Sequence, residues 1–323
     1  MKSLDDLIRA VQAHGSTPRL AIAPCAERFV LRAALAAAEK GLAIPVFIGH
    51  RERACTAAET LCPNFADYEF IDCPDDSEAV AKAVDLYRQG DVQLIMKGLV
   101  STSTLLKAVL AKDAGLVAPG GILSLVSVFD APQHPETSGE PRLMLLTDAG
   151  VNIRPNLQRK VDILKNAIAV ARALKIERPR AAILAATEKV NFPAMPATLD
   201  ADLLAKMGAE GVFGDARVAG PLALDLAVSP VSARLKRIDN PVAGHADILL
   251  TPDIESGNIL HKSISTLLNV PIASVVVGSK VPVVVPSRGD TEGSKFASIA
   301  LAVYLAQQNG TQQGGAQTIQ PGT

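Results

Sequence analysis

A serine and an arginine follow an apolar run near the end of the chain, in the order Ser287-Arg288-Gly289-Asp290. An arginine guanidinium offers a fixed planar set of donors for a carbonyl or phosphate oxygen. Asp290 or Glu292 could accept a proton, although acidic residues at a helix start are also favoured by the helix dipole. The segment therefore predicts a catalytic site made of Ser287, Arg288 and Asp290, with a purely electrostatic role of the acids left open.

A second apolar run is followed by a lysine and a glycine, and hydroxyl side chains begin three residues after the glycine. Free backbone N–H groups at a helix start, together with serine and threonine hydroxyls and an ammonium group, suit a phosphate or a phosphorylated acyl group. The segment is not a Walker A loop, because the G-x-x-x-x-G-K-[ST] pattern is absent. Helix capping by Ser101 or Thr102 remains open as the alternative interpretation. The predicted ligands of this turn are Lys97, Gly98, Ser101, Thr102 and Thr104.

Three further segments carry polar side chains just after predicted strands. The carboxyl ends of strands in a doubly wound sheet face the ligand crevice, so these side chains are expected to point toward a bound substrate. A surface salt bridge for Arg154 and a loop-holding role for Asn191 remain open, and Asn156 is expected to cap a helix. The carboxylates near Asp253 could bind a divalent metal, serve as a general base or cap a helix. The predicted substrate-binding residues are Asn152, Arg154, Asn191, Glu255 and Asn258.

Metal and disulfide chemistry are not predicted. The four cysteines contain no C-x-x-C pair and all lie in the first quarter of the chain, so we expect reduced, structural thiols. His245 and His261 lack the i, i+4 partner of a zinc-binding helix. We therefore predict no metal and no permanently bound cofactor.

The elements that must position these residues alternate between short aliphatic runs and longer segments of helical period. This alternation predicts an α/β fold with mainly parallel sheets, in which several strands are apolar throughout because both faces are buried. A polar segment rich in proline and glycine, residues 130–141, is either a hinge or a hairpin loop. The expected strands are 20–23, 44–48, 68–71, 92–96, 123–129, 143–146, 181–184, 247–250, 273–277 and 281–285.

Composition excludes several classes of function. The chain has 323 residues, 48% of them hydrophobic and 20% charged, with a net charge of -1, so no nucleic-acid partner is expected. Trp is absent and only three Tyr are present, which leaves few stacking platforms for bases. Residues 1–15 include Asp5, Asp6 and Arg9, and are neither a signal peptide nor an apolar span of ~20 residues. We therefore expect a cytoplasmic protein without a membrane partner.

Five motifs stand in order along nearly the whole chain. They are K-G-L-V-S-T-S-T-L-L-K-A-V-L from Lys97, T-D-A-G-V-N-I from Thr147, G-P-L-A-L-D from Gly220, D-I-L-L-T-P-D-I-E-S-G-N-I-L-H-K-S from Asp247 and S-R-G-D from Ser287. Together they resemble the phosphate acetyltransferase and phosphate butyryltransferase family, and the motif from Gly220 is closer to the butyryl branch.

The resemblance implies a two-domain fold like that of isocitrate and isopropylmalate dehydrogenases, a homodimer and an active site in an interdomain cleft. We expect a first domain of residues 1–135 plus 281–323 and a second of 136–280, with the return of the final segment implied by the family. The implied reaction is reversible: acyl-CoA plus inorganic phosphate gives acyl phosphate plus coenzyme A, which is a substrate.

Ser287 and Arg288 match a family pair at the site of coenzyme A binding and catalysis. The family's general base, seven residues further on, falls on Ser294 in this chain, so Asp290 is our substitute for that base. Two alternatives remain: an NAD(P)- and metal-dependent hydroxyacid dehydrogenase on the same fold, or a non-catalytic acyl-CoA sensor. The sequence does not predict the length of the acyl chain.

Overall fold

The protein, a computed structural model, is described for residues 1–132 and 141–314 and forms two compact units. Unit 1 comprises Met1–Asp6 and Ile122–Ile272, and unit 2 comprises Leu7–Gly121 and Ala273–Thr323. The expected domain change at 135/136 falls among residues 133–140, outside the described residues. The chain passes between units at 6/7, 121/122 and 272/273, whereas the sequence predicts crossings at 135/136 and 280/281.

The strands of unit 2 lie in the order β3-β2-β1-β4-β11-β10. All neighbours are parallel except β10 and β11, which form an antiparallel pair. β4 therefore lies between β1 and β11, with Ile95 opposite both Ala21 and Val283. The bounds are β1 Arg19–Ala23, β2 Ile44–Gly49, β3 Phe70–Asp72, β4 Leu94–Lys97, β10 Ile272–Val277 and β11 Val283–Val284.

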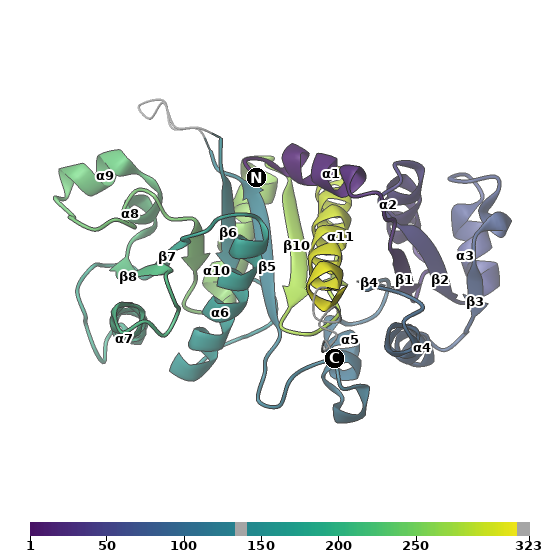
Figure 1. The fold of residues 1–323 in the computed structure, drawn as a ribbon, viewed down its shortest axis with the longest axis horizontal. Helices are drawn as coiled ribbons and strands as arrows, with labels where there is room; N and C mark the ends of the chain where they lie inside the picture. The colour runs from purple at the N-terminus through teal and green to yellow at the C-terminus, as the bar shows by residue number, and fades with distance from the viewer. Residues whose placement is uncertain (133–140, 315–323) are drawn as a thin grey trace, which may run out of the picture. The chain divides into compact units, whose positions relative to one another are not determined.

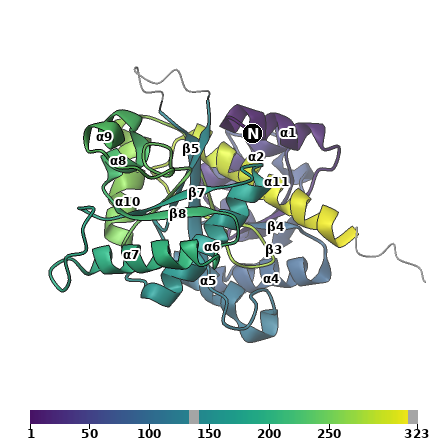
Figure 2. The same ribbon diagram turned by 60° about the vertical axis from the view of Figure 1, so that its left-hand side comes forward.

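Helices cover both faces of this sheet. α4 packs on β1, β2 and β4, while α11 packs on β4, β11 and α2, and Figure 2 shows α2 and α11 on the side away from α4 and α5. Local signals fix α4: Asp75 accepts the N–H groups of Ser77 and Glu78, and Gly90 ends the helix at a φ of 84°. The helices are α1 Leu4–Ala13, α2 Arg28–Glu39, α3 Arg51–Ala58, α4 Asp76–Gln89, α5 Thr102–Leu110 and α11 Glu292–Gly314, with 3-10 turns at Phe65–Asp67 and Lys112–Ala114.

The strands of unit 1 lie in the order β5-β6-β9-β7-β8, and β5 is antiparallel to β6 while the other neighbours are parallel (Figure 1). Because β5 and β6 are adjacent and antiparallel, the polar segment between them connects a hairpin, one of its two predicted roles. The bounds are β5 Ser124–Asp130, β6 Leu143–Thr147, β7 Arg180–Leu184, β8 Arg217–Leu222 and β9 Ile248–Leu250.

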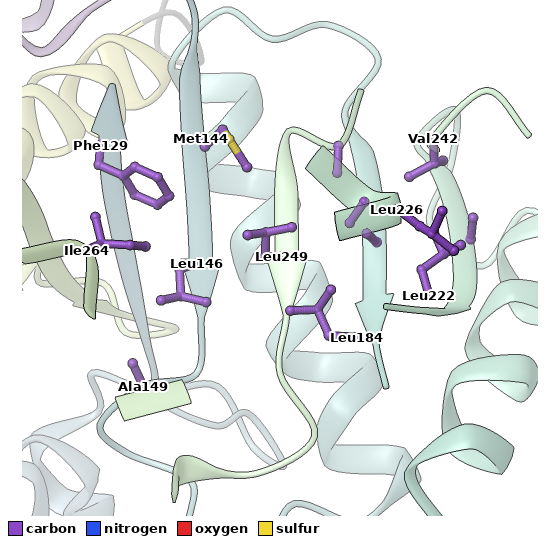
Figure 3. Packing of buried hydrophobic residues seen from close by; sticks show 14 of the residues in the cluster. Phe129, Met144, Leu146, Ala149, Leu184, Leu222, Leu226, Val242, Leu249 and Ile264 are labelled. Atoms are coloured by element: carbon purple, nitrogen blue, oxygen red, sulfur yellow. The ribbon is translucent and has the colours of Figure 1, made fainter. Parts of the chain in front are cut away.

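The core of unit 1 is a continuous apolar cluster on one face of this sheet. Figure 3 shows Phe129, Met144 and Leu249 from three neighbouring strands, with Ile264 and Leu226 from the covering segments. All of these side chains are at least 94% buried, so the cluster contributes apolar burial that stabilises this unit. The helices are α6 Leu157–Ala173, α7 Pro196–Ala209, α8 Leu224–Val228, α9 Pro230–Leu235 and α10 Ile254–Lys262, followed by a π-helix at Ser263–Leu267.

The predicted α/β class with mainly parallel sheets is confirmed, and each expected strand has a counterpart. β8, Arg217–Leu222, was not predicted; it contains Gly220 and Pro221, which are uncommon in strands. It lies at the edge of the sheet, where a proline costs no ladder hydrogen bond on its outer side.

Candidate active site

Unit 2 brings Lys97 and Arg288 together at the carboxyl edge of its sheet. β4 and β11 run parallel with Met96 opposite Val284, so both residues leave the sheet in the same direction. Burial, and then the positive charge of Arg288, lowers the pKa of the Lys97 ammonium below its ordinary value. Two cations close enough to repel each other make a site that an anion would stabilise. We call this group the unit 2 strand-end site: Lys97, Gly98, Ser101–Thr104 and Ser287–Asp290.

Lys97 is held by the turn that follows it. Its Nζ donates to the carbonyl oxygens of Gly98 and Val100, both at 2.9 Å. Gly98 is required here by space, since a Cβ at this position would lie 1.6 Å from the carbonyl oxygen of Pro24. The close approach of the β1 and β4 ends therefore fixes where the ammonium points.

Ser101 caps α5, as one of the two interpretations expected. Its Oγ accepts the backbone N–H of Thr104 at 3.0 Å and lies 2.8 Å from the hydroxyl oxygens of Ser103 and Thr104. The capping role is confirmed, while ligand binding by Ser101, Thr102 and Thr104 stays a prediction. The hydroxyls gather at a helix start beside Lys97, which is the arrangement that favours an anion.

The Ser287–Asp290 turn is closed by its own acid. The backbone N–H of Ser287 donates to Asp290 Oδ2 at 2.8 Å, and Asp290 N donates to the Ser287 carbonyl at 3.2 Å. Buried Lys295 supports the turn by donating to the carbonyl oxygens of Arg288 and Asp290. The Arg288 guanidinium is exposed and makes no hydrogen bond or ion pair with any residue that the structure describes. It is thus free for a ligand.

Ser294, the position of the family's base, is buried and bonded within the helix start. Its hydroxyl lies 3.0 Å from the hydroxyl of Thr291, and its N–H donates to the same oxygen at 3.1 Å. Asp290 remains the predicted base, although its carboxylate also shapes the turn.

In unit 1, a buried acid organises the loop after β6. Asp148 is 3% exposed, and burial raises the pKa of its carboxyl group against the opposing effect of hydrogen bonds. Oδ1 accepts from the N–H groups of Gly150 and Val151, and Oδ2 accepts from the N–H and Nδ2 of Asn152. The four bonds give this loop one conformation and fix the position of Asn152.

Asn152 holds an arginine that the sequence interpretation missed. Its Nδ2 donates to Leu123 O at 2.8 Å as well as to Asp148, and its Oδ1 accepts from Arg159 NH1 at 3.2 Å. Both amide donors are therefore committed inside the chain. Asn152 orients the exposed Arg159, and direct binding of a substrate by Asn152 stays a prediction.

Arg154 and Asp253 lie close together between the ends of β6 and β9. Asp253 caps α10 by accepting the N–H of Ser256 at 2.9 Å, which confirms one of its three predicted roles. Burial acts to raise the pKa of Asp253, but hydrogen bonds from Ser256 and the charges of Lys160 and Arg154 outweigh it and hold the pKa below the ordinary value. Arg154 is exposed and makes no hydrogen bond or ion pair within the described part of the chain.

The other predicted ligands in unit 1 are exposed. Asn258 donates from Nδ2 to Ala149 O at 3.3 Å, whereas Glu255 lies one turn earlier on α10. Asn191 holds its loop through the backbone, since its N–H donates to Thr198 Oγ1 at 2.9 Å and its carbonyl accepts from Met195. With Arg154 and Arg159 they form the unit 1 strand-end site, in which binding by each residue stays a prediction.

The carboxylates that a metal-dependent dehydrogenase would need are separated. Asp247 precedes β9 and is bound by Arg180, with two nitrogens at 2.9 Å, and by Arg142, whereas Asp253 follows the strand. Within residues 1–132 and 141–314, no group of three or more His, Cys, Asp or Glu could hold a metal ion.

Comparisons with known proteins identify the family of the chain. A family described as "Phosphate acetyl/butaryl transferase" matches residues 76–303. The chain is 38% identical to phosphate butyryltransferase of Clostridium acetobutylicum over 306 residues, covering 95% of this chain and 99% of the relative. The chain belongs to this family.

Further comparisons fit the same family of phosphate acetyl/butyryltransferases. Phosphate acetyltransferase of Thermotoga maritima is 38% identical, covering 91% of this chain and 97% of the relative. A crystal structure of a branched-chain phosphotransacylase from Enterococcus faecalis, 32% identical, superposes with a TM-score of 0.76 over 89% of this chain and 99% of its own. A 4-hydroxythreonine-4-phosphate dehydrogenase from Salmonella typhimurium, 16% identical with a TM-score of 0.53 over 91% of this chain and all of its own, shows the shared fold.

The predicted family, the dehydrogenase-like fold and the assignment as an acyltransferase enzyme are therefore confirmed. The comparisons favour this assignment over the hydroxyacid dehydrogenase and the acyl-CoA sensor. Among the described residues of this family member, no helix is long and apolar enough to cross a membrane.

Proposed function

We propose that this phosphate acetyl/butyryltransferase moves a short acyl group reversibly between coenzyme A and inorganic phosphate, with Arg288 as the main catalytic residue. The observation that carries the proposal is the free guanidinium of Arg288 beside the half-buried Lys97, at the ends of two adjacent parallel strands. Family membership gives the type of reaction. Arg288, beside Lys97, is the group that would stabilise the negative charge that develops in this reaction.

In the direction that acylates coenzyme A, its sulfur forms a bond to the acyl carbon of acyl phosphate while the bond from that carbon to the phosphate oxygen breaks. The proton lost by the thiol ends on the departing phosphate. An unperturbed thiol, with a pKa near ~8.5, is mostly protonated at neutral pH, so a cationic field or a base must favour the thiolate.

Arg288 would supply that field and would stabilise the carbonyl oxygen as negative charge grows on it. A well-placed donor of this kind is typically worth ~3–4 kcal/mol, or ~100- to 1,000-fold in turnover. Asp290 is the proposed base. We propose that Lys97 with the Ser101–Thr104 turn of unit 2 binds phosphate oxygens. Arg154 of unit 1 is proposed separately as a residue that can bind a phosphate oxygen.

The test is phosphate-dependent release of coenzyme A thiol, measured with acetyl-, propionyl-, butyryl- and branched acyl-CoA. Arg288→Ala should lower kcat by ~100-fold or more, and Arg288→Lys should recover only part of it because the planar fork is lost. Arg88→Ala is the matched control, since this exposed arginine lies at the end of α4 that precedes β4. A folded Arg288→Ala enzyme with wild-type turnover would refute the assignment.

We further propose a cytoplasmic homodimer. The cytoplasmic location is supported by four unpaired cysteines, as expected in a reducing compartment. Cell fractionation tests the location, and light scattering of the purified protein tests the dimer.

A further inference from the structure

A cavity of about 320 Å³ opens between α2 and α11 of unit 2. Ligand pockets commonly measure ~300–1,000 Å³, so this one suits a nucleoside-sized group and is too small for a whole coenzyme A molecule. Its walls come from residues 27–36, which include the first two and a half turns of α2, and from residues 292–296 at the start of α11; α2 is the helix that follows β1 along the chain, and α11 the helix that follows β11. It therefore lies at the same edge of the sheet as the unit 2 strand-end site.

The shape of the cavity comes from small residues placed between two phenyl rings. Phe29, Ala33 and Ala36 lie on one face of α2 at helical spacing, and Phe296 lines the cavity from α11. Both rings are partly exposed, and the alanines leave the space between the helices unfilled. An aromatic base is a ligand that such rings bind well, because stacking on a phenyl group is favourable for any base.

The charges around the cavity favour an anion at its rim. Arg32 is paired with Glu292, which joins the two helices. The Arg28 guanidinium is exposed and, among the described residues, makes no hydrogen bond or ion pair. Glu27, also in the wall, likewise has a carboxylate free to accept from an exocyclic amine. The cavity thus offers ring faces, one acceptor and one free guanidinium.

Lys295 joins this cavity to the catalytic turn. Its ammonium lies 5.2 Å from the ring centroid of Phe29 and donates to the carbonyl oxygens of Arg288 and Asp290. A molecule bound in the cavity would therefore be separated from the Ser287–Asp290 turn by no more than the side chain of Lys295. In our proposal the reacting sulfur binds at that turn.

We propose that this cavity binds the adenosine 3′-phosphate end of coenzyme A, with the base against Phe29 and Phe296 and the 3′-phosphate on Arg28. The inference rests on the proposed function, because it assigns one part of that substrate to a place in the chain. The pantetheine arm then leads along Lys295 toward Arg288.

The decisive experiment compares KM for butyryl-CoA and for 3′-dephospho-butyryl-CoA. Arg28→Ala should raise KM for butyryl-CoA ~10-fold, as for loss of one charge-assisted hydrogen bond, and change KM for the dephospho substrate less than ~2-fold. Arg88→Ala should change neither. An equal effect of Arg28→Ala on both substrates would overturn the assignment of the 3′-phosphate.

A second variant and a direct binding measurement guard against misfolding or an inactive enzyme. Ala36→Leu fills the cavity and should raise KM for both acyl-CoA substrates while KM for phosphate is unchanged. Unchanged KM for both acyl-CoA substrates would overturn the proposal.

Calorimetry should show that adenosine 3′,5′-bisphosphate binds to the wild type, and that this binding is weakened ~10-fold in Arg28→Ala. Binding of this nucleotide that does not compete with acyl-CoA would instead indicate a separate nucleotide site. A wild type that binds it without any acyl transfer would contradict the proposed function alone.

Discussion

Replacing Gly98 by alanine adds one methyl group where the backbone of Pro24 passes. The new Cβ would lie 1.6 Å from the Pro24 carbonyl oxygen and 2.7 Å from its carbonyl carbon. Real Cβ atoms essentially never come within 3.0 Å of another heavy atom, so the two backbones must separate by about 1.4 Å, the difference between 3.0 and 1.6 Å. No side-chain rotation can relieve this contact, because the obstacle is main chain.

The separation has a cost that can be estimated. Lys97 pairs with Ala23 in the ladder, and Gly98 N donates to Ala23 O at 3.0 Å, so moving the strands apart breaks a buried hydrogen bond. Overpacking costs ~1–3 kcal/mol, and an unsatisfied buried backbone group costs ~1–3 kcal/mol more. We expect Gly98→Ala to lower the free energy of unfolding by ~3–5 kcal/mol, a large share of the ~5–15 kcal/mol typical of a domain.

The assay is urea unfolding followed by circular dichroism, with Gly289→Ala as the matched control. A Cβ on Gly289 would meet nothing within 4 Å, so that variant should stay within ~0.5 kcal/mol of the wild type. Gly98→Ala should also lower turnover where it is still folded, because the Gly98 carbonyl is one of the acceptors that position Lys97. Stability of Gly98→Ala within ~1 kcal/mol of the wild type would refute this steric reasoning.

Three further perturbations test other parts of the structure. The folded-state pKa of Lys97 lies below its ordinary value of 10.5, so the folded protein loses this proton at a lower pH than the unfolded chain does. The unfolding free energy of the wild type, relative to that of Lys97→Met, should therefore rise as the pH approaches 10.5. Urea unfolding that gives the same difference at every pH would contradict this. Asp148→Asn must turn an NH2 group toward two N–H donors whichever way the amide is placed, so it should lower the unfolding free energy by ~2–4 kcal/mol, and a neutral result by thermal unfolding would count against the loop network. Burial raises the pKa of the Cys25 thiol to about 12 while Cys55 is exposed, so Ellman's reagent at pH 8 should modify Cys55 in the native protein and Cys25 only after denaturation, as mass spectrometry of the labelled peptides would show.

Strands were predictable from sequence where both faces of the sheet are buried. Residues 20–23 and 143–146 are apolar throughout because helices cover them on both sides, and this composition is visible without a structure. β8 was not predicted because glycine and proline, here Gly220 and Pro221, usually interrupt a strand. They are accommodated in β8 because it lies at the edge of the sheet.

The candidate site was predictable as a set of strand ends, but not in its bonding. Asn152 and Arg154 have similar sequence contexts. The side-chain NH2 group of Asn152 donates both of its hydrogens within the chain, whereas Arg154 makes no hydrogen bond with any described residue. This difference depends on interatomic distances, which the spacing of residues in the sequence does not give. Arg159 could have been predicted as a site residue from the sequence. A cation in the first turn of α6 is disfavoured by the helix dipole, so its presence there indicates another role. In the structure, the Arg159 guanidinium donates to the side-chain Oδ1 of Asn152, which explains its position.

Because unit 2 contains both early and late parts of the chain, its assembly depends on the order of synthesis. β4 acquires its neighbour β11 only after Val283 has emerged, by which time the intervening Ile122–Ile272 of unit 1 has been synthesised. A nascent chain arrested before Ala273 would hold an unpaired strand edge on β4, a surface prone to aggregation until the last segment arrives. The same discontinuity means that linking β11 and α11 in front of α1 by circular permutation would give β4 its neighbour β11 early, while β10 would still be the last strand of unit 2 to be made.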